Sequence, residues 1–387
     1  MDLDLSPAQR TFRDDVRAFI RERLPLGIRE RLRQGHPPRK EDTVTWQRIL
    51  HERGWAAPHW PRRYGGAELG TMERLILLDE IYRAPAPLPQ VFNVGMLGPV
   101  LLKYGTEAQR EFFMPKLARL DLWFCQGFSE PGSGSDLASL RTSARREGNH
   151  YVVNGQKIWT TTAHVADWMF ALVRTAAEAR KQEGISFLLI DLRTPGITIR
   201  PIISIDGGHH LNEVFLDQVR VPTANLVGEQ DRGWECAKFL LGNERTGIAN
   251  VGLCRERLDY ARELATRLRS GGRPMAEEPS LQASIAELDA EIRALEITNW
   301  RFLLTQSEQQ RLPAFASVLK LKGTELQQAV MALLARLDGV AGLERRRDTD
   351  VTSNGPLAPR YLYSRAASIY GGTSEIQKDI LSKAIVG

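Results

Sequence analysis

Apolar residues at helical spacing mark the first part of the chain. From Phe12 to Ile20 they recur three or four positions apart, with Arg and Asp residues between them, which is typical of an amphipathic helix. Ser6-Pro7 comes directly before this run and is a plausible N-cap followed by a first-turn proline. The same pattern predicts further helices near residues 46–50, 72–82 and 97–104. We therefore expect a helical domain over residues 1–120.

The pattern changes over residues 121–230. Short runs rich in β-branched and aromatic residues are separated by turn-forming residues such as Gly184 and Pro195-Gly196, which is typical of strands joined by turns. Strands are expected at residues 151–153, 168–173, 185–190, 197–200 and 214–221. This part of the chain therefore predicts a small β-barrel-like domain.

Long amphipathic runs return in the last part of the chain. They cover roughly residues 233–269, 280–306 and 314–337, and Ser270–Pro274 separates the first two. Apolar residues from Leu281 to Leu295 keep the spacing of a buried stripe. A four-helix bundle over residues 231–387 fits this pattern, so the fold class expected for the whole chain is α+β.

Charge and composition restrict the function classes. The 387 residues carry a net charge of +5, which could serve a nucleic acid or another polyanionic ligand. The only dense basic run, Arg345–Arg347, is followed at once by Asp348. We interpret the surplus as solvated helix surface and expect no nucleic acid as partner. No apolar run reaches the roughly 18 residues of a membrane helix, so no membrane partner is expected either.

Cysteines and histidines point to no metal site. Cys125, Cys236 and Cys254 are far apart and odd in number, which fits neither a disulfide framework nor a metal cluster. The adjacent residues His209 and His210 would face opposite ways on a strand. The acidic N-terminus also lacks the apolar core of a signal peptide. A reducing cytoplasm is the expected compartment.

The first candidate for chemistry is the loop Phe124-Cys-Gln-Gly-Phe-Ser-Glu-Pro-Gly-Ser-Gly-Ser-Asp136. Its glycines let the backbone approach a ligand closely, and its serines add small hydroxyls. Main-chain N–H groups in such a loop can hold a phosphate or the polar edge of a flat ring. Composition alone is equally compatible with an ordinary surface turn.

A second candidate follows at Tyr151-Val-Val-Asn-Gly-Gln-Lys-Ile-Trp-Thr-Thr161. Asn154-Gly155 predicts a hairpin with a type I′ turn. Period-two alternation then places Trp159 and Thr161 on one face and Thr160 on the other. An indole beside a hydroxyl could stack on a conjugated ring and bond its edge. A core tryptophan beside a solvated threonine is the alternative.

Together these stretches resemble the acyl-CoA dehydrogenase family. The family pattern Thr/Ser-Glu-Pro-Gly-x-Gly-Ser-Asp matches Ser129–Asp136, and Asn-Gly-x-Lys-x-Trp-x-Thr matches Asn154–Thr161. A third match, Ile369-Tyr-Gly-Gly-Thr-Ser-Glu-Ile-Gln377, lies near the C-terminus. The resemblance spans most of the chain. It implies the family's fold, FAD as cofactor, and oxidation of an acyl-CoA thioester to the 2-enoyl-CoA.

The resemblance also implies roles for single residues. Phe128 and Ser129 would meet the pyrimidine edge of the flavin, and Trp159 and Thr161 would lie against the ring near its reactive nitrogen. The other residues implied are Gly134, Ser135, Thr373 and Glu375 for the cofactor, and Ser135, Arg245, Gly371 and Gly372 for the substrate.

The expected catalytic base is displaced from its usual position. Family chemistry removes an α proton with a carboxylate while the β hydride passes to flavin N5. A buried glutamate suits this task because burial raises its pKa toward neutrality. Most members carry that glutamate in Ile-Tyr-Glu-Gly-Thr, where this chain has Gly371. Glu244-Arg245 matches a minority placement, so we expect Glu244 to be the base. The Gly371 N–H can still bond the thioester carbonyl.

Two further departures from the family pattern concern the stretches that would bind the FAD of a neighbouring subunit. The Arg-x-x-Phe-Gly and Gln-x-x-Gly-Gly stretches that hold a neighbour's FAD in family homotetramers are replaced here by residues 268–274 and 335–343. The chain thus resembles the large subunit of two-subunit pimeloyl-CoA and sterol side-chain acyl-CoA dehydrogenases. A homologous smaller subunit in a heterotetramer, or else a homo-oligomer, is expected, with an electron-transfer flavoprotein as acceptor.

Alternatives remain open at this point. A relative with oxygen chemistry and a non-catalytic subunit of a heteromeric dehydrogenase would share these motifs. Lipid, sterol or dicarboxylate catabolism would each suit the reaction, because the sequence does not specify the acyl group.

Overall fold

The computed structural model describes residues 5–33, 36–177, 180–244, 249–304, 313–337, 339 and 357–386, without the side chains of residues 243, 244, 304 and 313. Two compact units make up the chain. Unit 1 comprises Met1–Trp46, Leu69–Leu88 and Arg245–Gly387, and unit 2 comprises Gln47–Glu68 and Pro89–Glu244. Within the described ranges, no helix has both the length and the apolar character needed to cross a bilayer.

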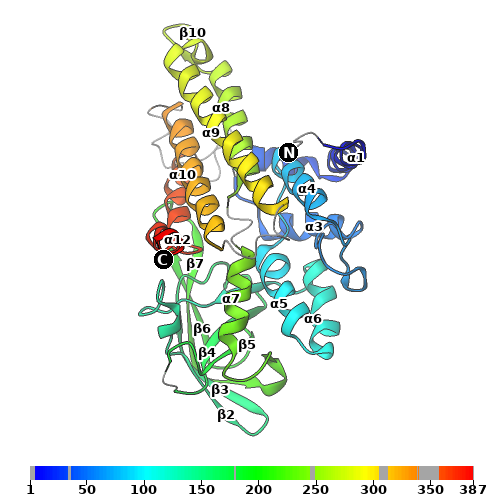
Figure 1. Cartoon of the computed structure of the whole chain (residues 1–387), viewed down its shortest axis with the longest axis vertical. Helices are drawn as coiled ribbons and strands as arrows, with labels where there is room; N and C mark the ends of the chain where they lie inside the picture. The colour runs from blue at the N-terminus through cyan, green and yellow to red at the C-terminus, as the bar shows by residue number, and fades with distance from the viewer. Residues whose placement is uncertain are drawn as a thin grey trace. The chain divides into compact units, whose positions relative to one another are not determined.

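The helices and strands run in the order helical, β, helical (Figure 1). The helices are α1 Pro7–Arg23, α2 Leu26–Arg33, α3 Lys40–His51, α4 Thr71–Arg83, α5 Gly98–Tyr104, α6 Glu107–Arg119, α7 Gly233–Glu244, α8 Val251–Arg267, α9 Pro279–Leu304, α10 Pro313–Leu337, α11 Leu357–Ser364 and α12 Ser374–Val386. The strands are β1 Phe124–Gly127, β2 Ser143–Glu147, β3 His150–Lys157, β4 Trp168–Arg174, β5 Ile185–Asp191, β6 Ile197–Ile203, β7 His209–Pro222, β8 Leu226–Val227, β9 Arg269–Ser270 and β10 Arg273–Pro274.

Unit 1 is helical. Helix α1 begins as predicted, because the Ser6 hydroxyl accepts from the Gln9 N–H while the Gln9 side chain accepts from the Ser6 N–H. Helices α8, α9 and α10 lie side by side, and α10 also contacts α11 and α12 (Figure 1). The stripe predicted on α9 is confirmed, since Leu281, Ile292 and Leu295 are buried in this bundle's core.

Unit 2 is organised around an eight-stranded sheet. Its strand order is β6-β7-β3-β2-β4-β5-β8, with β1 pairing in parallel to β4. All five strands expected from the sequence are present, and β1, β2 and β8 are additional.

The expected run over residues 233–269 contains two helices, α7 and α8, and the predicted break at residues 270–274 is a short β9–β10 hairpin.

The central strands β4 and β5 are buried on both faces. Phe170 and Phe187 stack at 5.7 Å between ring centroids and pack in one core with α5, α6 and α7. Their neighbours Met169 and Leu188 point into a second core with β3 and β7. Both strands are therefore nearly continuous apolar runs, and burying each large side chain contributes about 1.5–3 kcal/mol. This packing gives the loops at the strand ends a rigid support.

The predicted hairpin at Asn154-Gly155 is wrong. Both residues lie inside the continuous strand β3, and the turn falls at Gly148-Asn149, between β2 and β3. The pairing of β3 with β7 shifts register between Val153 and Gly155, where two residues of β7 face one residue of β3, so the extra residue of this β-bulge lies on β7. Gly155 has φ +152°, and a Cβ there would lie 2.6 Å from the Thr142 Oγ1. Asn-Gly therefore continues the strand here and does not reverse the chain.

Candidate functional site

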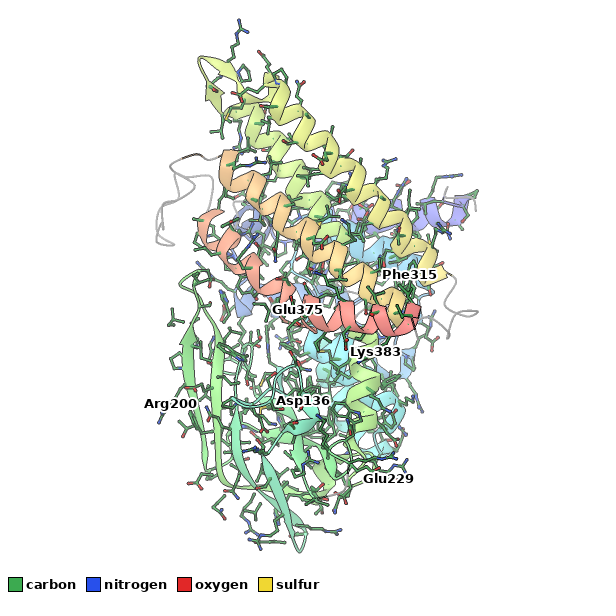
Figure 2. The ribbon with its side chains drawn as sticks, turned by 60° about the vertical axis from the view of Figure 1, so that its left-hand side comes forward. Asp136, Arg200, Glu229, Phe315, Glu375 and Lys383 are labelled. Atoms are coloured by element: carbon green, nitrogen blue, oxygen red, sulfur yellow. The ribbon has the colours of Figure 1, made fainter. Side chains whose placement is uncertain are left out.

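The loop after β1 is closed by its own short-range hydrogen bonds. Glu130 and Ser133 exchange backbone N–H···O=C bonds of 2.9 and 3.0 Å around Pro131-Gly132. The Ser133 hydroxyl donates to the backbone oxygens of Asp136 and Leu137. Asp136, labelled in Figure 2, is exposed at the end of the loop. It accepts 2.7 Å bonds from the Lys181 ammonium. The bonds of Glu130 and Ser133 thus keep the loop in one shape.

A buried ion pair fastens this loop to the end of β3. The Lys157 side chain is fully buried, and its Nζ donates to Glu130 Oε1 at 2.8 Å and to the Phe128 and Leu172 carbonyls at 3.2 and 2.7 Å. The Glu130 carboxylate also accepts from the N–H groups of Arg141 and Thr142 at 2.6 and 2.9 Å. Both charges are therefore satisfied by hydrogen bonds, as burial requires.

Burial and pairing act on these two groups in opposite directions. Burial lowers the pKa of Lys157 to about 8, although Glu130 opposes the shift. For Glu130, burial works to raise the pKa, but Lys157 and the donors around the carboxylate leave it below its ordinary value. The pair therefore stays ionic near neutral pH.

The loop and the segment after β3 are brought together. The Ile158 N–H donates to the Ser129 carbonyl at 2.9 Å, so Ser129 lies beside Trp159. The Phe128 ring is packed in the core against Phe170 and Phe187, so only its backbone can serve a ligand. Gly134 and Ser135 are exposed on the loop, where a Cβ at Gly134 would meet nothing within 4 Å.

Residues 159–161 fit a flat conjugated ligand. The Trp159 side chain is 56% exposed and its backbone has φ +58°, an unusual conformation for a bulky residue. Strand β3 ends at Lys157, so strand alternation does not orient these residues as predicted. Thr160 is buried, whereas Thr161 is half-buried. The buried Thr160 Oγ1 has no hydrogen-bond partner among the described residues. The exposed Trp159 indole and the half-buried Thr161 suit the flavin that the motifs imply.

Asn212, on β7, holds the same segment from the other side. The buried Asn212 accepts from the Thr160 N–H through its backbone oxygen and donates to the Thr160 carbonyl through Nδ2, both at 3.0 Å. It also contacts His164 and His209, whose rings stack at 3.9 Å. His210 instead faces Asp206 at 3.0 Å. Among the described residues, no group of three potential metal ligands is found.

Glu130, Lys157 and Asn212 are functional candidates that sequence reasoning missed. Glu130 and Lys157 lie inside the two quoted motifs, so the motif letters themselves were a signal. Asn212 carried no such signal, because its contacts to Thr160 join residues 52 positions apart.

The third motif lies in unit 1, at the start of α12. Gly371 and Gly372 have φ +63° and +88°, and the Gln377 side chain donates to the Gly371 carbonyl at 3.1 Å. Thr373 caps α12 by accepting from the Ile376 N–H. Glu375 is exposed in the first turn of this helix (Figure 2). A bond from its own backbone N–H and one from Thr373 lower its pKa.

For the expected base, Glu244, the structure describes the backbone alone. Glu244 is the last residue of α7. Its side chain and the whole of Arg245 lie outside the described part of the structure, as does the run Arg345–Arg347.

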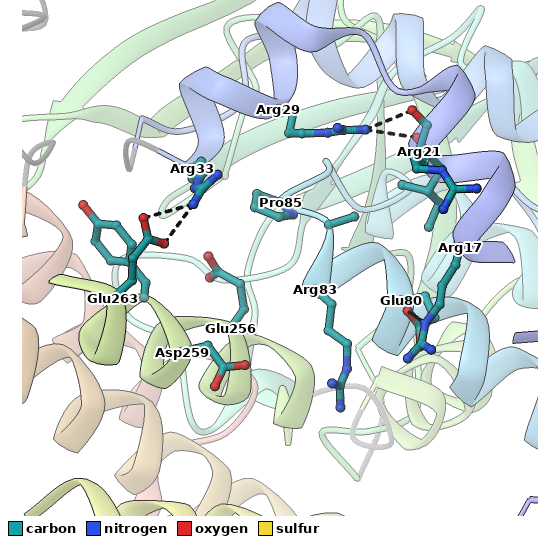
Figure 3. Close-up of a pocket in the computed structure, with 13 residues that line it drawn as sticks. Arg17, Arg21, Arg29, Arg33, Glu80, Arg83, Pro85, Glu256, Asp259 and Glu263 are labelled. Atoms are coloured by element: carbon teal, nitrogen blue, oxygen red, sulfur yellow. Dashed lines mark hydrogen bonds and ion pairs between the residues drawn. The ribbon is translucent and has the colours of Figure 1, made fainter. Parts of the chain in front are cut away.

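A charged cavity of about 490 Å³ lies within unit 1 and is lined by none of the predicted site residues (Figure 3). Arg17 pairs with Glu80 at 2.8 Å, and Arg33 donates to both oxygens of Glu263 at 3.0 Å. Arg29 donates to the Arg21 carbonyl at the end of α1. One ion pair thus joins α1 to α4 and another joins α2 to α8, so we interpret these charges as structural.

Three family models match consecutive parts of the chain. The N-terminal, middle and C-terminal domains of acyl-CoA dehydrogenase match residues 6–121, 125–219 and 231–386. Acyl-CoA dehydrogenase FadE26 of Mycobacterium tuberculosis is 33% identical over 100% of this chain and 98% of its own length. Acyl-CoA dehydrogenase IpdE1 of the same organism is 33% identical over 97% of both chains.

Solved structures agree with these matches. A chain of the ChsE4-ChsE5 complex from Mycobacterium tuberculosis has a TM-score of 0.85 at 32% identity, covering 100% of this chain and 99% of that one. A chain of the Tcur3481-Tcur3483 steroid ACAD has a TM-score of 0.87 at 31% identity, with the same coverage. The α+β fold expected from the sequence is confirmed, and the chain belongs to the acyl-CoA dehydrogenase family of flavin-dependent oxidoreductases.

Proposed function

We propose that this protein is an FAD-dependent acyl-CoA dehydrogenase that converts a thioester to its 2-enoyl-CoA, with Glu244 as the α-proton base. The observation that carries the proposal is the hydrogen bond between Ile158 and Ser129 beside the exposed indole of Trp159. Two motifs far apart in the sequence meet there in a surface suited to a flat ring. Bound FAD would supply the hydride acceptor.

The chain's own residues would divide the remaining work. The Ser129 backbone, Trp159 and Thr161 would hold the ring. The exposed Gly134 and Ser135, together with Thr373 and Glu375 at the start of α12, would complete the cofactor contacts. Gly371 would donate its N–H to the thioester carbonyl, which makes the α proton more acidic. Ser135, Arg245 and Gly372 would contact the rest of the substrate.

Glu244 would take the α proton, and Gly371 supports this assignment. Its φ of +63° is one that L-residues rarely adopt. A glutamate at position 371 would be strained in this backbone, so the base is expected elsewhere.

The relatives guide the choice of substrate and partner. One structural neighbour is described as the ChsE4-ChsE5 complex and another as the Tcur3481-Tcur3483 steroid ACAD, so each is named for two proteins. We therefore propose a bulky, steroid-type acyl-CoA as substrate and a homologous smaller chain as partner in a heterotetramer. An electron-transfer flavoprotein is proposed as the acceptor.

The test is anaerobic bleaching of the flavin by acyl-CoA in a Glu244→Gln variant. Because the amide keeps the shape but cannot take a proton, the rate should fall by about 10²–10⁴-fold with acyl-CoA affinity nearly unchanged. Steroid-type and straight-chain acyl-CoA thioesters are compared as substrates.

Glu235→Gln is the matched control. Glu235 lies on the same helix and pairs with Arg232 at 2.6 Å on the surface, so its rate should stay within about twofold of wild type. A near wild-type rate in Glu244→Gln would remove Glu244 as the base. If no acyl-CoA bleaches even the wild-type flavin, a non-catalytic subunit becomes the better assignment.

A further inference from the structure

The buried ammonium of Lys157 touches both motifs at the proposed flavin surface. It donates to Glu130 and to the Phe128 carbonyl, and it lies two residues before Trp159. Resting on the proposed FAD site, we propose that the Lys157–Glu130 pair is a positioning pair that aims the Ser129 N–H and the Trp159 segment at the flavin.

The direction of the Ser129 N–H follows from peptide geometry. The Phe128 carbonyl and the Ser129 N–H belong to one planar trans peptide, so they point in opposite directions. The carbonyl points inward, because it accepts from the buried Lys157 Nζ at 3.2 Å. The Ser129 N–H therefore points away from the ammonium, toward the outer side of the loop. This is the side from which a ring could approach, since Ser129 itself is half-buried.

The charge of Lys157 also strengthens this donor. A cation bonded to a carbonyl polarises the whole peptide, and the N–H at its other end becomes a better donor. The low dielectric of the interior increases that effect, because the Lys157 side chain is fully buried. A stronger donor at the polar edge of a flavin favours negative charge on the ring and raises its reduction potential.

The Lys157–Glu130 pair also positions the segment that follows β3. Glu130 is held by the N–H groups of Arg141 and Thr142, so it anchors Lys157 at the end of β3. The next residue, Ile158, donates to Ser129, and Trp159 follows at φ +58°. Displacing Lys157 would therefore shift the Ser129 amide and the Trp159 indole together.

Stability alone is a weak reason to keep such a pair. Taking two charges out of water costs about as much as their attraction returns, and well-packed neutral replacements are often equally stable. A positioning role predicts that neutral replacements preserve folding while altering the bound flavin.

The experiment uses the double variant Lys157→Met/Glu130→Gln, in which no charge is left unpaired. FAD affinity should fall at least about tenfold, the loss expected for one charge-assisted hydrogen bond. The visible flavin spectrum should shift and the midpoint potential should fall, while the thermal midpoint of the FAD-free protein stays close to wild type. Lys157→Gln/Glu130→Gln retains a neutral donor and should recover part of the affinity.

Lys181→Met is the matched control, because it removes an exposed lysine–aspartate pair at the end of the same loop. Its FAD affinity should change by less than about twofold. If Lys157→Met/Glu130→Gln folds and binds FAD with wild-type affinity, spectrum and potential, the pair is structural only and the proposal is overturned.

A measurement on the wild type covers the case in which both double variants fail to fold. FAD should slow hydrogen exchange of the Ser129 amide, and unchanged exchange would overturn the proposal. Failure of the proposed function looks different, because the wild-type protein would then take up no flavin even when it is co-expressed with a homologous smaller chain.

Discussion

At the residue scale, Gly371 carries the largest consequence for the chemistry. Its left-handed backbone, φ +63°, is held by the Gln377 side chain, which donates to the Gly371 carbonyl. An L-residue in this conformation costs about 1–2 kcal/mol. The backbone at position 371 therefore favours glycine over the usual glutamate. Restoring a glutamate there would lower the stability of the fold.

A directed rescue tests this interpretation. In the Glu244→Gln background, Gly371→Glu should raise the anaerobic bleaching rate at least about tenfold over Glu244→Gln alone, because a carboxylate again serves as general base. The free energy of unfolding should fall by about 1–2 kcal/mol, measured by denaturant titration.

Gly371→Gln in the same background is the control, because it brings the same strain without a carboxylate. Equal bleaching rates in the two double variants would mean that position 371 cannot present a base in this protein.

At the element scale, the alternation of side chains along β3 decides where Lys157 stands. Side chains an even number of positions apart share a face of a strand, so Lys157 points the same way as the buried Val153. Gly155 lies between them on that face, where Thr142 leaves no room for a Cβ. The unbroken course of β3 past Gly155 therefore turns Lys157 inward, toward Glu130.

Gly155→Ala should therefore destabilise unit 2 by about 1–3 kcal/mol, the usual cost of forcing atoms into a packed site. The new Cβ would lie 2.7 Å from the Thr142 Cα. Denaturant unfolding measures the loss, and FAD affinity should fall with it.

Gly132→Ala is the control in the same unit, since a Cβ there meets nothing within 4 Å. Its unfolding free energy should change by no more than about 0.5 kcal/mol. A similar change in both variants would show that position 155 tolerates a side chain.

At the scale of the whole molecule, the question is how much flavin the chain can hold by itself. The stretch at residues 268–274, where homotetrameric relatives are expected to hold a neighbour's cofactor, is here the β9–β10 hairpin. The second such stretch, at residues 335–343, lies largely outside the described residues. The structural neighbours include the ChsE4-ChsE5 complex and the Tcur3481-Tcur3483 steroid ACAD, each named for two proteins. This supports our proposal of a sister chain that completes the flavin site.

Purified alone, the protein should therefore contain less than one FAD per chain, and co-expression with a homologous smaller chain should raise the content. Flavin absorbance against protein concentration measures the ratio. One tightly bound FAD per chain without any partner would contradict this prediction. In that case Arg273 or the run Arg345–Arg347 would be the residues to replace next.

Much of the fold was determined by the sequence itself. The stripe on α9, the capping box of α1 and the five main strands rest on local periodicity and local hydrogen bonds, which act between residues near in sequence. The motif letters also identified the family, and the two segments that they assign to the flavin stay a proposal. The domain limits, the base and the individual site contacts stay predictions.

Only the tertiary structure decided the rest. Asn154-Gly155 looks like a turn, yet pairing with β7 on one side and β2 on the other holds it in a strand. The partners of Lys157, the clamp of Asn212 on Thr160 and the meeting of Ser129 with Ile158 join residues 15 to 52 positions apart. Such contacts depend on packing and register across the whole sheet, which a local pattern does not encode. The sequence therefore determined which residues are available for the chemistry, and packing decided which of them meet.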